Sequence, residues 1–131
     1  MPTLSDPKLA ITVATGSGNA TVTVSVDVSF TQGEKSLMGV FPDLDYIVTC
    51  KAIGADSGSD DDNLFQVGSA RIRDDQNDLT FSRLVAKSEL DEDNPGDDEI
   101  YARFTCVPNP EFPLEVKPAE PVNSSEVHGS F

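Results

Sequence analysis

Carboxylates dominate the residues of this sequence that could do chemistry. The densest run is Asp-Glu-Asp-Asn-Pro-Gly-Asp-Asp-Glu at 91–99, and a looser pair stands at 43 and 45. Carboxylates that converge repel one another unless a cation neutralises them, and Ca²⁺ accepts several hard oxygen ligands in flexible geometry. The pattern therefore predicts a calcium site, with candidate ligands Asp43, Asp45, Asp91, Asp93, Asp97, Asp98 and Glu99.

The run at 91–99 lacks one calcium motif and resembles another. An EF-hand that begins at Asp91 would need acidic ligands where Pro95 and Ala102 stand. Closely spaced Asp residues before an apolar strand resemble the calcium loop of C2 sandwich domains, and residues 41–48 resemble the first loop of that family. Glu99 departs from the pattern, which has Asp there. The resemblance implies a C2-like sandwich that binds Ca²⁺, but we favour the interpretation that these loops are only solvated.

Other residue patterns that could support catalysis are incomplete in this sequence. A Ser or Cys nucleophile needs a base within hydrogen-bond reach, and the single histidine, His128, stands in a polar tail where we expect it to be exposed. The glycines at 16 and 18 join two predicted strands, whereas a phosphate-binding loop joins a strand to a helix. The sequence therefore predicts a protein that is not an enzyme.

The two cysteines, Cys50 and Cys106, each lie in a predicted strand. They could form a disulfide across the core of a sandwich or remain as buried free thiols. The chain opens without a basic and apolar leader, which favours free thiols and a cytoplasmic protein, although a mature exported form fits the same residues. Paired strand cysteines resemble immunoglobulin-like domains and imply a sandwich, but Trp is absent and Phe104 replaces the usual Tyr.

Alternation of apolar and polar residues predicts most of the fold. The pattern is clearest at 20–30, and Ser36–Pro42 is expected to be a loop or short edge segment because it contains Gly39 and Pro42. At 79–90 a strand is favoured, with a helix through Phe81, Leu84 and Val85 as the alternative. Antiparallel strands are predicted at 8–15, 20–30, 44–53, 64–73, 79–90 and 100–107.

These elements predict a single-domain, all-β antiparallel sandwich over residues 1–131, immunoglobulin-like or C2-like, with about seven or eight strands. Residues 108–131 are expected to form a proline-rich, extended C-terminal tail. No apolar run approaches the length of a membrane span.

The net charge of the chain limits the kinds of partner that we expect it to bind. The 131 residues include 9 basic and 23 acidic ones, for a net charge of −14, which excludes a nucleic-acid binder. More than half of the acidic residues fall within 56–99, so we expect an acidic loop face, if the loops emerge at one end. We predict a non-catalytic binding or structural module for a protein partner with a basic surface. The alternatives are a calcium-binding sandwich and an assembly subunit of a particle or appendage; the oligomeric state stays open.

Overall fold

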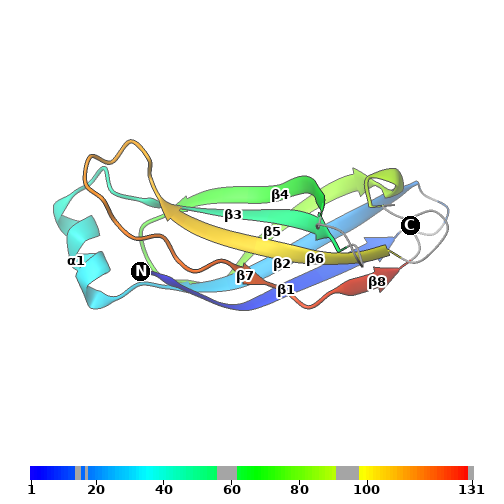
Figure 1. Cartoon of the computed structure of the whole chain (residues 1–131), viewed down its shortest axis with the longest axis horizontal. Coiled ribbons are helices and arrows are strands. Elements are labelled where there is room, and N and C mark those ends of the chain that lie inside the picture. Colours follow the sequence, from blue (N-terminus) through cyan, green and yellow to red (C-terminus); the bar gives the residue numbers. More distant parts are fainter. Residues whose placement is uncertain (14–15, 17, 56–61, 91–97, 130–131) are drawn as a thin grey trace.

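The computed structural model describes residues 1–13, 16, 18–55, 62–90 and 98–129, which form two antiparallel sheets around one core (Figure 1). The first sheet has the order β1-β2-β5, with strands β1 (Thr3–Val13), β2 (Asn19–Ser29) and β5 (Gln76–Ala86). The second has the order β4-β3-β6-β7, and β8 also pairs with β6; its strands are β3 (Tyr46–Gly54), β4 (Asp62–Ile72), β6 (Asp98–Pro108), β7 (Val122–Asn123) and β8 (Val127–Gly129). The predicted all-β antiparallel sandwich is confirmed. Within the described residues, no helix has the length and apolar character needed to cross a membrane.

The core forms where the apolar faces of the two sheets meet. Every second residue of β2 faces inward, and Val22, Val24, Val26 and Val28 are at most 2% exposed. The second sheet contributes buried side chains from β3 and β6, among them Tyr46, Val48 and Phe104. The period-two prediction for 20–30 is therefore confirmed, because a strand with one buried face must alternate.

The stretch 79–90 is a strand, as favoured, and the helical alternative is wrong. Residues 76–86 form β5, and only Lys87–Glu89 turn into a short 3-10 helix. The strand begins earlier than expected, at Gln76, which pairs with Val28 of β2. Cross-strand pairing thus extends the strand into the polar residues that precede position 79.

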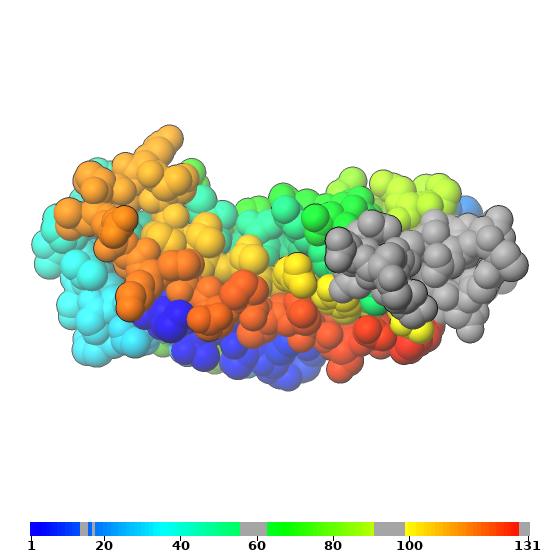
Figure 2. Space-filling view, in the orientation of Figure 1, coloured from blue at the N-terminus to red at the C-terminus, as the bar shows by residue number. Residues whose placement is uncertain are grey.

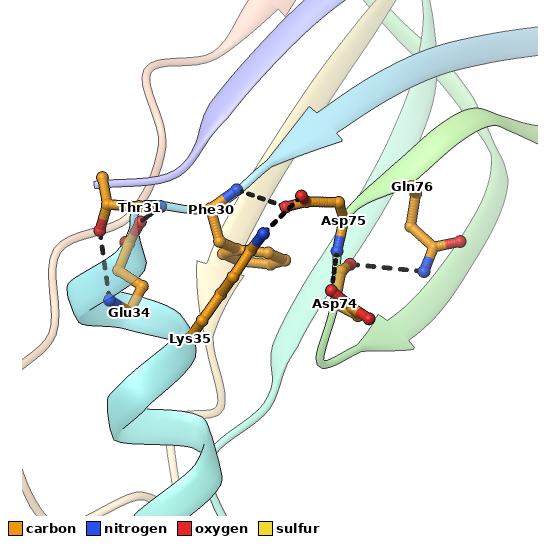
Figure 3. A network of polar contacts seen from close by, with 7 residues as sticks. All are labelled: Phe30, Thr31, Glu34, Lys35, Asp74, Asp75 and Gln76. Carbon is orange, nitrogen blue, oxygen red and sulfur yellow. Dashed lines mark hydrogen bonds and ion pairs between the residues drawn. The ribbon is translucent and has the colours of Figure 1, made fainter.

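The segment Ser36–Pro42 was expected to be a loop or short edge segment, and that expectation is wrong because α1 (Gln32–Val40) includes its residues 36–40. The Oγ1 atom of Thr31 accepts the Glu34 N–H at 3.2 Å, and Oε1 of Glu34 accepts the Thr31 N–H at 2.8 Å (Figure 3). This reciprocal cap starts the helix, and Met38 packs into the core. Together they outweigh the poor helix propensity of Gly33 and Gly39.

Both cysteines are buried and free, which confirms the interpretation as free thiols. They lie on neighbouring strands of one sheet, where Cys50 is opposite Phe104 and Cys106 is opposite Val48. A disulfide across the sandwich is therefore wrong, and the immunoglobulin resemblance does not extend to the cysteines, since that family's bridge joins two sheets. Burial raises the pKa of both thiols to about 12.

The segment after Pro108 runs back along β6 and lies between that strand and β1 (Figure 1). Parts of this segment pair with β6 as the short strands β7 and β8. In addition, Ala119 donates its N–H to the Cys106 carbonyl at 2.9 Å. Ser124 donates to the Ala102 carbonyl and accepts the Ala102 N–H at its Oγ, both at 2.8 Å. The C-terminal segment therefore closes one side of the sandwich.

Candidate functional site at the helix end of the sandwich

The predicted calcium ligands do not gather in one place. Asp43 and Asp45 precede β3, at the end of the sandwich where Tyr46 pairs with Pro108. Glu99 lies at the opposite end, near the pairing of Gly54 with Ile100. The expectation that the two groups converge is wrong, because β3 and β6 are antiparallel and the residues that precede each strand lie at opposite ends. Asp43 and Glu99 therefore cannot share an ion.

Four further residues, Asp91, Asp93, Asp97 and Asp98, were predicted as calcium ligands. Asp91, Asp93 and Asp97 lie outside the described residues, and Asp98 is described by its backbone alone, which pairs with Gly129.

Glu99 has two neighbours that the sequence analysis did not group with it, Glu126 and His128. His128 is exposed, as predicted, and it lies 3.6 Å from Glu99 and 3.8 Å from Glu126. One ligand atom from each of the three side chains lies within 4.8 Å of the others. Strand β8 brings them together, because His128 is directly opposite Glu99.

At the other end of the molecule, α1 is held in place near its first turn. Asp75, in the turn after β4, accepts the N–H of Phe30 at 2.8 Å and pairs with the ammonium of Lys35 at 2.7 Å (Figure 3). The Lys35 hydrogen bond, followed by the bond from Phe30, lowers the pKa of the Asp75 carboxyl. Two contacts to one carboxylate thus fix both the end of β2 and the start of α1.

The later part of α1 is anchored as well. Arg73 donates to the carbonyl of Pro42 at 3.0 Å and to that of Met38. On the inner side, the buried Glu34 carboxylate lies 3.4 Å from the Tyr46 hydroxyl and 3.4 Å from the Met1 ammonium. Burial, together with the Glu34 charge, raises the pKa of Tyr46. The helix is therefore a fixed platform at this end.

Several large apolar side chains are exposed at this end of the molecule. Val40 is 70% exposed, and Leu114, in the segment after β6, is 55% exposed. The rings of Phe41 and Phe112 meet edge to face at 5.6 Å and join the helix to that segment. Both segments lie at the same end of the molecule (Figures 1 and 2). We call this surface the apical patch; it consists of Leu37, Val40, Phe41, Phe112 and Leu114.

A cavity of about 480 Å³ adjoins the apical patch and shares Phe112 with it. The Oδ2 atom of Asp45 lies 3.4 Å from Arg71, whereas its Oδ1 atom is covered and has no hydrogen-bond partner among the described residues. The far wall is fixed because Asn109 donates its N–H to the Asp45 carbonyl at 2.9 Å and accepts the Glu111 N–H at its Oδ1 at 3.0 Å. The cavity is lined by Pro42, Asp43, Asp45, Arg71, Asn109, Glu111, Phe112 and Pro113.

The charges around this cavity are unbalanced. Asp43, Asp45 and Glu111 contribute carboxylates, and Arg71 is the one cationic side chain among the lining residues. The side chain of Arg71 is 60% exposed, so solvent screens much of its charge. A cavity with excess negative charge attracts a cationic group and repels an anionic one.

Comparisons with known proteins assign no family to this chain. No protein-family model matches it. No curated protein and no solved structure shows a significant similarity to it either.

Proposed function

We propose that the protein is a non-catalytic binding module that recognises another protein through the apical patch. The observation that carries this proposal is the exposure of Val40 and Leu114 on a fixed backbone. Among the described residues, half of the large apolar side chains that are exposed belong to this one surface: Leu37, Val40, Phe41 and Leu114. Grouped exposed apolar side chains are typical of interaction sites, since burying them against a partner is favourable.

The anchoring of α1 supports the same proposal. Arg73 and the Thr31–Glu34 cap hold the helix before any partner arrives. A surface that is already ordered loses little conformational entropy on binding, so more of the contact energy appears as affinity.

The chemistry of the described residues supports a role without catalysis. Cys50 and Cys106 are buried and their pKa values are raised to about 12, so neither thiol forms the thiolate that a nucleophile requires. His128 lies at the end of the sandwich opposite the cavity and is no base for groups there. The net charge of −14 favours a partner with a basic surface.

The experiment is a selection of peptides from a random phage-displayed library on the immobilised protein. We expect enriched peptides whose affinity falls by about tenfold or more in the double variant Val40→Ser/Leu114→Ser. Leu84→Ser is the matched control, because Leu84 is 66% exposed on β5, outside the patch. Circular dichroism checks that all variants fold. Peptides that bind wild type and the patch variant equally well, or no enrichment at all, contradict the proposal.

A second candidate function is the binding of a divalent transition metal by Glu99, Glu126 and His128. The proximity of their three ligand atoms favours it. Imidazole suits Zn²⁺, Ni²⁺ or Cu²⁺, whereas Ca²⁺ prefers an all-oxygen set, so this cluster supports a different ion from the one the sequence predicts.

Thermal melting tests this second candidate. Zn²⁺ added to chelator-treated protein should raise the melting temperature of wild type and of Asp43→Asn, and leave that of His128→Gln unchanged. An equal rise in all three proteins would indicate binding elsewhere. A rise with Ca²⁺ that persists in His128→Gln would instead support the calcium prediction for the acidic run.

A further inference from the structure

We infer that the partner presents an arginine side chain to the acid-lined cavity, while apolar residues beside that arginine cover the apical patch. This inference rests on the proposed function and adds the chemistry of the partner to it. The two surfaces are continuous, because the cavity wall includes Phe112, whose ring contacts Phe41 in the patch. One short segment of a partner can therefore engage both surfaces.

Charge complementarity selects a cation. The carboxylates of Asp43, Asp45 and Glu111 outnumber the guanidinium of Arg71. Arg71 satisfies only Oδ2 of Asp45, and that contact, at 3.4 Å, is long. A cation that enters the cavity lowers the electrostatic repulsion between the three carboxylates, so its binding there is favourable.

The state of Asp45 favours a donor with more than one N–H group. Its Oδ1 atom is covered and accepts no hydrogen bond, which is costly for a carboxylate oxygen. A guanidinium presents several N–H donors in a planar fork and pairs with both oxygens of a carboxylate at once. Such a guanidinium would take the place of the exposed Arg71 at Oδ2 and supply a donor to the covered Oδ1.

The arrangement fits an organic cation better than a metal ion. Within the described part of the chain, the cluster that brings three ligand atoms within 4.8 Å of one another lies at the opposite end of the sandwich, and the cavity carboxylates do not form such a set. The cavity volume of about 480 Å³ also exceeds what a single ion fills. An arginine brings a long apolar stem that packs along Phe112 while its charged head reaches the carboxylates.

The test is a titration of the ¹⁵N-labelled protein with three acetylated, amidated tripeptides, Leu-Arg-Leu, Leu-Lys-Leu and Leu-Gln-Leu, followed by NMR. We expect the arginine peptide to shift the backbone amides of Asp45, Asn109 and Phe112. It should bind about fivefold or more tightly than the glutamine peptide, and also more tightly than the lysine peptide. Equal binding of the arginine and lysine peptides would overturn the two-oxygen pairing.

Variants then locate the effect. Asp45→Asn should weaken binding of the arginine peptide about fivefold and leave that of the glutamine peptide unchanged. The exposed Glu111→Gln provides a second variant in case the first does not fold, and Glu126→Gln, at the opposite end of the sandwich, is the matched control. If the glutamine peptide shifts the same amides with equal affinity, the apical patch stands as a binding surface and the arginine inference fails. If the arginine peptide shifts no amide of the cavity at about 10 mM, the inference also fails, whatever the peptide selection finds.

Discussion

The ring of Phe81 in β5 lies against the backbone of Gly68 in β4, so closely that a Cβ atom on Gly68 would be 2.6 Å from the ring carbon Cγ. The two strands belong to different sheets, and this contact helps to close the side of the sandwich away from the C-terminal segment. Two residues along β5, Arg83 donates to the Gln66 carbonyl at 2.6 Å and lies over the Phe65 ring. The join between β4 and β5 therefore depends on the absence of a side chain at position 68.

Gly68→Ala should destabilise the protein by about 1–3 kcal/mol, because the added methyl group overlaps the Phe81 ring and forces it to move. Gly39→Ala is the matched control. A Cβ atom there meets no atom within 4 Å, so alanine should stabilise α1 by about 0.5–1 kcal/mol. Urea denaturation gives both values. If Gly68→Ala is as stable as wild type, β4 and β5 can move apart without a loss of stability, which contradicts the prediction.

Asp75→Asn should remove a pH-dependent part of the stability. The Lys35 hydrogen bond and the Phe30 N–H lower the pKa of Asp75 in the folded state. A group with a lowered folded-state pKa stabilises the protein above its unfolded value, about 3.9, and loses this contribution as the pH falls through the folded value. Wild type should therefore be more stable than the variant at pH 7, and the difference should vanish at strongly acidic pH. A difference that stays constant with pH would contradict this assignment.

The two thiols should be unreactive in the folded protein. With pKa values raised to about 12 by burial, Cys50 and Cys106 should resist Ellman's reagent at pH 8 and react fully in urea. Because the folded pKa lies above the unfolded one, about 8.5, the thiols stabilise the fold fully below that pH and progressively less as the pH rises towards 12. Cys50→Ala should therefore reduce the alkaline loss of stability. Rapid labelling of the native protein would show that the sheets open readily.

Arg73→Gln should loosen the end of α1 that carries the apical patch. The variant removes the donors to the Met38 and Pro42 carbonyls and should cost about 1–2 kcal/mol. Hydrogen exchange should accelerate at the last amides of α1. Arg71→Gln is the control, since it breaks only an exposed ion pair and should cost at most about 1 kcal/mol. Equal effects of the two substitutions would show that Arg73 does not anchor the helix.

Local patterns in the sequence predict the strands well and the helix poorly. The alternation through β2 survives in the structure because one face of the strand meets the core along its whole length. The helix was missed although its signal was present, since Thr31 and Glu34 have the spacing of a reciprocal cap. Gly33 and Gly39 disfavour a helix and outweighed that signal. The burial of Met38 decides the conformation, and this burial depends on tertiary contacts.

The site was predictable only in part. Asp43 and Asp45 stood out as carboxylates before a strand, and the structure places both beside a cavity. The opposite wall, Asn109–Pro113, comes from a segment more than sixty residues later, and it arrives there because β6 pairs with β3. The meeting of Glu99 with His128 likewise follows from the register between β6 and β8. The register between strands that are distant in sequence is set by the packing of the whole core, so no local sequence pattern predicts it.

The order of the strands also bears on how fast the chain reaches its native state. The hairpins β1–β2 and β3–β4 join neighbours in sequence, but β2 must also find β5, with Asn19 opposite Ala86, and β3 must find β6. Closing such large loops lowers the entropy of the chain before the paired strands contribute any stabilising energy. Proteins with this connectivity therefore fold in milliseconds to seconds. A β1–β2 or β3–β4 hairpin that formed before these pairings would expose its apolar face, and the negative charge of the chain would then help to keep separate molecules apart.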